Sequence, residues 1–240
     1  AKESMRRLKS IGINFIYPDS TNTGHPLCEP GSTLSFAEIL RAADDFGMLV
    51  AITQPHFGQY DWKKTDADRS NGYAHHAKFY VRVAQNHPSV VFYATSHNAI
   101  GSGDDMNPDR IDGIERPYSP WSQENVSNAL RAEAIIYSLD PDRIIYHHSG
   151  KLSSMHTSNF YPNWVPIQEM NDWFEHWATV GVKPVLLCEF GAPFTWDWAI
   201  YSPRGKVPER RTDAGRMKWT GGVCYVHYCT VHFWPTRRFY

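Results

Sequence analysis

Short apolar runs recur along the chain, and each one follows a segment with the spacing of an amphipathic helix. The helical patterns cover residues 2–10, 36–46, 74–85, 122–137 and 166–177. The apolar runs that follow them cover residues 14–17, 48–52, 90–94, 143–146 and 185–188. Continuous apolar runs between helices are typical of parallel strands that are buried on both faces. The alternation therefore predicts an α/β fold.

Each helical pattern is stopped by a glycine or a proline before its strand begins, at Gly12, Gly47, Pro88, Pro141 and Gly181. Ser35 and Glu38 have the spacing of a capping box, and Ser122 is expected to cap the helix that follows it. No GxGxxG or Walker motif follows a predicted strand, which disfavours an open nucleotide-binding sheet. Polar and aromatic residues follow the strands instead, where barrel enzymes carry their active sites. We therefore expect a (β/α)8 TIM barrel.

Composition excludes some classes of function. The formal net charge is −1, so no global field attracts nucleic acid or an anionic membrane. No apolar run is long enough to cross a bilayer. Aromatic residues make up 14% of the chain, which suits either a large aromatic core or a cleft where rings stack on sugars. The four cysteines are scattered without a zinc-binding spacing, so we expect no metal and no cofactor.

Glu189 is the strongest catalytic candidate. It ends the apolar strand predicted over residues 185–188, and a charged residue there is costly unless it faces a polar cavity or a partner. Cleavage of a glycosidic bond normally uses two carboxyl groups, one on each side of the bond. In a barrel these groups lie at the carboxyl ends of strands. A structural salt bridge at the strand end is the alternative.

Several motifs occur in an order typical of one family. They are Lys183-Pro-Val-Leu-Leu-Cys-Glu-Phe-Gly191, Asn86-His-Pro-Ser-Val90, Asp140-Pro-Asp-Arg143 and the segment Ala43–Val50. Together they resemble the catalytic barrel of glycoside hydrolase family 2, over roughly residues 2–200. The resemblance implies that Glu189 is the nucleophile of a retaining mechanism and that the hydroxyl of Tyr161 orients it. It also implies a carbohydrate substrate and suggests a periplasmic or extracellular location.

The family resemblance also bears on the domain organisation. A barrel of this family has a strand before the helix predicted at residues 2–10, so we expect an incomplete barrel over residues 1–200 that lacks its first strand. Residues 201–240 carry eight Lys/Arg against two Asp/Glu and show no clear period. They are expected to form either a last barrel strand or a disordered end.

One position departs from the family pattern. The family ends its fourth strand in Gly-Asn-Glu, with the glutamate as the acid and base, whereas this chain has Ser96-His97-Asn98. An amide cannot donate a proton as an acid. Three alternatives remain open: Asp104 or Asp105 reaches back from the flexible loop beyond, His97 acts as the acid, or the protein binds glycans without cleaving them.

Further polar and aromatic residues follow the predicted strands and are candidate sugar contacts, each equally compatible with a structural role. They are His56, Asn98, His147, His148, Tyr161, Trp164, Trp196 and Trp198. A metal site that combines His147 and His148 is disfavoured because adjacent residues of a strand point to opposite faces.

Three hypotheses follow. The first is a retaining β-glycosidase that acts on a plant or algal polysaccharide or on an oligosaccharide derived from one. The second is a glycan-binding pseudoenzyme, motivated by Asn98. The third is a barrel hydrolase with another arrangement of carboxylates, for instance an inverting one, in which the two carboxyl groups lie about 6.5–9.5 Å apart rather than about 5–5.5 Å.

Overall fold

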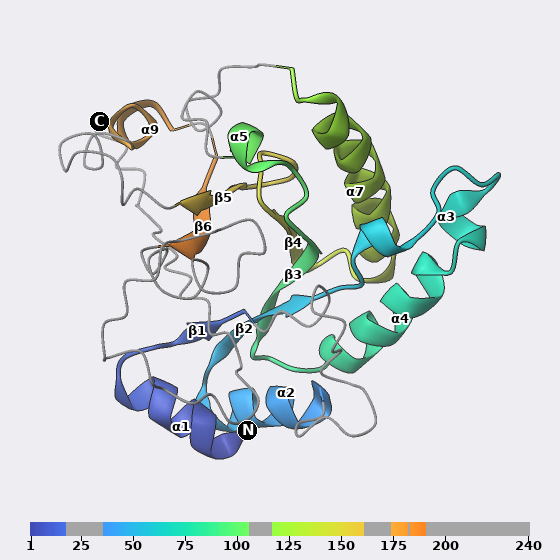
Figure 1. Ribbon diagram of the computed structural model, residues 1–240. Helices are drawn as coiled ribbons and strands as arrows, with labels where there is room; N and C mark the ends of the chain where they lie inside the picture. The colour runs from blue at the N-terminus through green and yellow to red at the C-terminus, as the bar shows by residue number, and fades with distance from the viewer. Residues whose placement is uncertain (18–35, 106–116, 161–173, 182, 191–240) are drawn as a thin grey trace, which may run out of the picture.

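The computed structural model describes residues 1–17, 36–105, 117–160, 174–181 and 183–190. This part of the chain is an α/β structure whose strands are all parallel within their sheets (Figure 1). One sheet has the order β1-β2-β3-β4, and β5 pairs with β6 in a second sheet. The strands are β1 (Phe15–Ile16), β2 (Leu49–Thr53), β3 (Val90–His97), β4 (Ile144–His148), β5 (His156–Phe160) and β6 (Val185–Phe190).

Helices precede most of these strands in the chain. They are α1 (Lys2–Ser10), α2 (Phe36–Phe46), α3 (Ala67–Ser70), α4 (Tyr73–Ala84), α5 (Ser102–Asp105), α7 (Pro120–Leu139), α9 (Glu175–Val180) and the 3-10 helix η1 (Phe57–Gln59). In Figure 1, α1 and α2 lie beside β1 and β2, whereas α4 and α7 lie together beside β3. None of the helices in the described ranges is long and apolar enough to cross a membrane.

Most of the predicted helices and strands are confirmed, and their ends differ by a few residues. The helix predicted from Ser122 begins instead at Pro120, because Ser119 is its cap and the Ser119 Oγ accepts a hydrogen bond from the Ser122 N–H at 3.4 Å. Proline is well suited to the first helical turn, where its missing N–H has no partner to lose. The predicted cap Ser35 lies outside the described residues, as does most of the helix predicted over 166–177.

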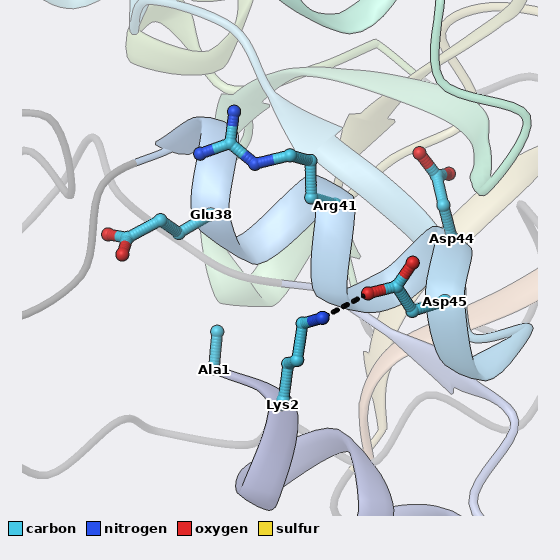
Figure 2. Close-up of a pocket in the computed structure, with 6 residues that line it drawn as sticks. All are labelled: Ala1, Lys2, Glu38, Arg41, Asp44 and Asp45. Carbon is cyan, nitrogen blue, oxygen red and sulfur yellow. Dashed lines mark ion pairs between the residues drawn. The ribbon is translucent and has the colours of Figure 1, made fainter.

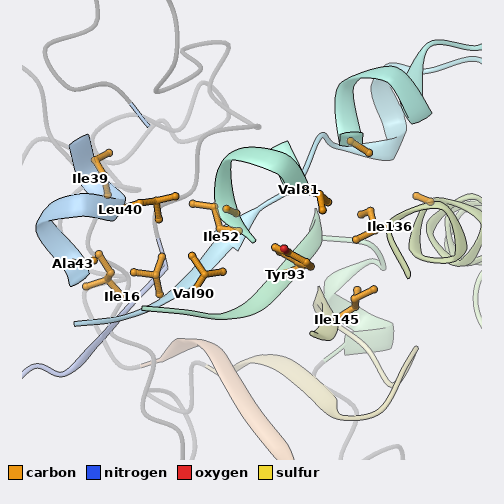
Figure 3. Packing of buried hydrophobic residues seen from close by; sticks show 14 of the residues in the cluster. Ile16, Ile39, Leu40, Ala43, Ile52, Val81, Val90, Tyr93, Ile136 and Ile145 are labelled. Atoms are coloured by element: carbon orange, nitrogen blue, oxygen red, sulfur yellow. The ribbon is translucent and has the colours of Figure 1, made fainter. Parts of the chain in front are cut away.

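The outer face of the four-stranded sheet packs against the helices (Figure 3). Val50 and Ile52 of β2 share one apolar cluster with Leu40 of α2, Val81 of α4 and Ile136 of α7. Burying such side chains contributes about 1.5–3 kcal/mol each. This cluster fixes the helices on the outer side of the strands.

The inner faces of both sheets meet in a second apolar cluster. Its buried members are Phe15, Tyr17, Ala51, Phe92, Ala94, Tyr146, Met155, Leu186 and Cys188. Phe92 packs edge-to-face on Phe15 and on Tyr146, with ring centroids 5.9 Å apart in each pair. Because residues from β1 and β6 share this cluster, the two sheets pack against one another through it. On the other face of β6, Val185 and Leu187 pack against Phe174 and Trp177.

Asp44 connects α2 to the beginning of β3. Its Oδ2 lies 2.6 Å from the His87 Nδ1, and its Oδ1 accepts a hydrogen bond from the Ser89 N–H at 3.0 Å. Partial burial alone would raise the pKa of Asp44, but the hydrogen bonds from Ser89 and His87 outweigh it and hold the pKa below its usual range. The motif Asn86-His87-Pro88-Ser89 therefore has a structural role at the amino ends of the strands.

We expect Asp44→Asn to lower the free energy of unfolding by about 1–3 kcal/mol at neutral pH, because the hydrogen bonds to a charged acceptor are lost. A lowered pKa in the folded state stabilises the protein above the unfolded pKa and loses that effect as the pH falls through the folded pKa. The difference between variant and wild type, measured by urea denaturation with tryptophan fluorescence, should therefore shrink as the pH falls below about 4. A difference that stays constant down to pH 3 would contradict this role.

Candidate active site at the carboxyl ends of the strands

The carboxyl ends of β3, β4 and β5 are connected by hydrogen bonds. The Asn159 Nδ2 donates a hydrogen bond to the Asn98 Oδ1 at 2.7 Å. The Asn98 N–H in turn donates to the His148 Nδ1 at 3.3 Å. Asn98 is therefore fixed between β4 and β5.

Asn98 has a left-handed backbone conformation, with φ at +52°. Asparagine and aspartate tolerate this conformation better than most residues, because their short polar side chains bond locally. The turn directs the chain from β3 into α5. A glutamate at this position would pay a conformational cost of about 1–2 kcal/mol.

An irregular register places Glu189 opposite Asn159. Ser158 pairs with Leu187, but the next residue of β5, Asn159, pairs with Glu189, so Cys188 is an extra residue in β6. Such a bulge resets the alternation of a strand and is frequent beside active sites. The backbone position of Glu189 therefore lies on the same face of the sheet as Asn159. The side chain of Glu189 is outside the described part of the structure, as is that of His97.

His148 and Tyr17 form the buried base of this region. Their rings stack with centroids 5.4 Å apart and an angle of 13° between the planes. Tyr17 directly follows β1, so the end of β1 joins the ends of β3, β4 and β5. The sequence analysis did not name Tyr17 or Asn159 as site residues. Tyr17 directly follows β1 and Asn159 lies near the end of β5, and these positions were the only signal in the sequence that could have identified them.

His147 lies on the opposite side of β4. Its Nδ1 is 2.6 Å from the Thr95 Oγ1, and its Nε2 is 2.8 Å from the Glu133 Oε2 on α7. The structure therefore places His147 between the sheet and α7, away from Asn98 and His148. The two adjacent histidines do point to opposite faces, as expected from strand geometry.

The two candidate acids of the loop after β3 both hold neighbouring backbone. The buried carboxylate of Asp105 accepts hydrogen bonds from the Gly150 N–H at 3.2 Å and from the Asn159 N–H at 2.9 Å. The Asp104 Oδ2 accepts from the N–H and the Oγ of Ser119, at 3.2 and 2.8 Å. Both carboxylates therefore act as anchors for the strand ends and for the start of α7.

His56 caps η1. Its Nδ1 accepts a hydrogen bond from the Gly58 N–H at 2.9 Å, and its ring stacks on Phe57 with centroids 4.8 Å apart. The remaining predicted sugar contacts, Tyr161, Trp164, Trp196 and Trp198, lie outside the described residues. Within the described ranges, no cluster of His, Cys, Asp and Glu has a metal-binding arrangement.

A cavity of about 440 Å³ lies elsewhere, between α1 and α2 (Figure 2). It is lined by Ala1, Lys2, Glu38, Arg41, Asp44 and Asp45. The Lys2 Nζ and the Asp45 Oδ2 form an exposed ion pair at 2.7 Å beside it. All residues that line this cavity come from α1, α2 or the residue before α1. Asn98, His148 and Asn159 do not line it, so it is separate from the candidate active site.

No protein-family model and no curated protein matches this chain. Among solved structures, it is similar to a β-glucuronidase of Bacteroides uniformis, with 16% identity and a TM-score of 0.44, over 77% of this chain and 22% of that one. A β-galacturonidase of Eisenbergiella tayi is 19% identical with a TM-score of 0.45, over 82% and 33% of the two chains. A β-glucuronidase of Parabacteroides merdae is 17% identical with a TM-score of 0.48, over 92% and 26%.

The Eisenbergiella protein is named as a member of glycoside hydrolase family 2, the family that the sequence motifs resemble. The present chain spans 22% to 33% of the length of these three structures. The similarity is distant, with a TM-score below 0.5 for each of the three structures.

We expect Asp105→Asn to loosen the ends of β4 and β5. The carboxylate accepts one backbone N–H on each of its two oxygens, whereas the amide has a single accepting oxygen and an NH₂ group that only donates. The free energy of unfolding should fall by about 1–3 kcal/mol. Hydrogen exchange should lose protection at the amides of Gly150 and Asn159 in particular. Asp45→Asn, which removes an exposed carboxylate, is the matched control and should change stability by less than about 0.5 kcal/mol. Unchanged protection at both amides would contradict the anchoring role.

Proposed function

We propose that this chain contributes the catalytic barrel of a retaining glycoside hydrolase that cleaves β-linked glycosides of a polysaccharide or oligosaccharide. In this proposal residues 1–200 belong to a (β/α)8 barrel. The inner cluster shared by β1, β4 and β6 supports a closed arrangement of strands. The carboxyl ends of those strands carry the chemistry.

The proposal rests on Asn159, which connects the positions of Asn98 and Glu189. Asn98 accepts a hydrogen bond from the side chain of Asn159, and Asn159 is the register partner of Glu189. A glycosidase needs one group on each side of the scissile bond. Asn159 brings the position of the nucleophile and the position of the acid to one end of the sheet.

Glu189 is assigned as the nucleophile. Its carboxylate attacks the anomeric carbon, the bond to the leaving oxygen breaks, and a covalent glycosyl-enzyme forms. Water then hydrolyses this intermediate with net retention of configuration. Asn98 hydrogen-bonds substrate hydroxyl groups in place of the acid, because an amide has donors and an acceptor but no acidic proton.

The first step therefore depends on the leaving group. Asp104 and Asp105 are assigned to anchoring rather than to proton donation, because backbone N–H groups occupy their carboxylates. A substrate with a poor leaving group needs protonation as its glycosidic bond breaks, whereas an activated aryl glycoside does not. Turnover should consequently be fast only with activated leaving groups.

Glycan binding without cleavage is the second candidate function, and Asn98 is the observation that favours it. The two functions differ in one measurable respect. A hydrolase with Glu189 as nucleophile releases dinitrophenol from dinitrophenyl β-glycosides and p-nitrophenol from p-nitrophenyl β-glycosides. The sugars to be tested include β-glucuronides, β-galacturonides and β-galactosides. A pure binding protein releases none.

We expect Asn98→Asp to restore a general acid. Aspartate tolerates the left-handed backbone and still accepts the hydrogen bond from the Asn159 Nδ2, so the geometry of the site is preserved. The kcat/KM for alkyl β-glycosides should rise about 10- to 100-fold, at or below the low end of what a general acid contributes. The kcat/KM for dinitrophenyl glycosides should hardly change. Asn98→Ala, which adds no carboxyl, is the control and should show no such gain.

We expect Glu189→Gln to lower the turnover of an activated β-glycoside by at least about 10³-fold, because the nucleophile is lost. Affinity for the glycan should survive, since the amide has nearly the same shape. Kinetics with p-nitrophenyl β-glycosides and calorimetry of glycan binding measure the two effects separately. Turnover close to that of wild type in this variant would refute the assignment of Glu189.

A further inference from the structure

An exposed tryptophan stands at the same end of the sheet as Asn98. Trp121 is in the first turn of α7, and 57% of its surface is exposed to solvent. A Cβ atom added to Gly101 would lie 3.8 Å from the ring of Trp121, so the indole packs beside the backbone of the loop that follows Asn98. Gly101 is three positions after Asn98, which limits the distance between their Cα atoms to about 11 Å.

The position of Trp121 is fixed by the helix cap Ser119 before it and by Ser122 after it. The Gly101 N–H donates a hydrogen bond to the Ser122 Oγ at 3.1 Å. Ser119 donates to the Asp104 Oδ2 from both its N–H and its Oγ. The start of α7 and the loop after β3 are therefore joined on both sides of Trp121. A ring held in this way loses little conformational entropy when a ligand stacks on it.

Other exposed aromatic residues of the described helices lack this setting. Tyr137 is 58% exposed on the same helix, but it lies sixteen residues further along, about 24 Å away at 1.5 Å per residue. Phe79 is exposed on α4. Single exposed apolar residues are common in soluble proteins and need no function. Trp121 differs because it adjoins the proposed active site and is anchored to it.

We propose that Trp121 is a stacking surface for a sugar ring of an extended glycan, beyond the sugar whose bond is broken. Indole presents a flat apolar face with a polar N–H at its edge, which complements the apolar face and the hydroxyl edge of a pyranose. The ligand class is a linear oligosaccharide, because Trp121 packs beside Gly101, three positions beyond Asn98, where a sugar ring next to the one that is cleaved would reach it. This inference rests on the carbohydrate specificity of the proposed function and does not require cleavage.

The test compares Trp121→Ala with Tyr137→Ala, a substitution of an equally exposed aromatic residue on the same helix. Wild type is first screened on immobilised cello-, xylo- and laminari-oligosaccharides, and the dissociation constant for the best ligand is then measured by calorimetry for every variant. We expect Trp121→Ala to weaken binding about tenfold, Trp121→Phe to recover part of the loss, and Tyr137→Ala to bind like wild type.

Three results would overturn the proposal. They are wild-type affinity in Trp121→Ala, an equal loss in Tyr137→Ala, and no binding of any of these oligosaccharides by wild type. Urea denaturation of each variant distinguishes loss of the stacking surface from loss of the fold, and Trp121→Phe retains a ring if the alanine variant unfolds. If aryl glycosides are not cleaved but Trp121→Ala binds glycans more weakly, the hydrolase proposal fails and the stacking surface stands.

Discussion

The inner faces of the strands meet in one apolar cluster, and the arrangement at the strand ends depends on that meeting. Phe15, Phe92, Tyr146 and Leu186 come from four different strands and are all buried together. Because they fix the spacing of the strands, the residues that follow at the carboxyl ends are brought within hydrogen-bonding distance. The contact between Asn98 and Asn159 joins residues that are 61 positions apart in the chain. The positions of polar groups at the strand ends can be well defined only if the core beneath them is tightly packed.

Much of the fold could be predicted from the sequence because its signals are local. Apolar runs between helix breakers indicated parallel strands, and strand alternation indicated that His147 and His148 point to opposite faces. The role of Asp105 could not be predicted in this way. Its partners, the amides of Gly150 and Asn159, are 45 and 54 residues away in the chain, so a loop carboxylate looked free to act as an acid. Likewise, Ser119 rather than Ser122 caps α7, because Pro120 suits the first helical position and the apolar pattern begins only later.

The proposed chemistry combines the hydrogen bonds that hold Asn98 in place with an amide where a glycosidase of the resembled family has a carboxyl group. Asn98 keeps the hydrogen bonds that hold the end of β3 against β4 and β5, while it gives up the acidic proton. Without an acid, cleavage is slow for substrates whose leaving group needs protonation, whereas the fold is little affected. Trp121 would then add affinity for a longer chain at a place that the exchange does not affect.

The extra residue in β6 has a consequence for how this protein tolerates insertions and deletions. Cys188 is the residue by which β6 exceeds β5 between the pairs Ser158–Leu187 and Asn159–Glu189. Loss of one codon there would leave both strands able to pair along their whole length, and the core residues before it would keep their places. The glutamate would then directly follow Leu187, would still stand opposite Asn159 and would keep its face of the sheet, but the inner cluster would lose the buried Cys188. The extra residue therefore fills the interior and does not decide on which face the glutamate lies.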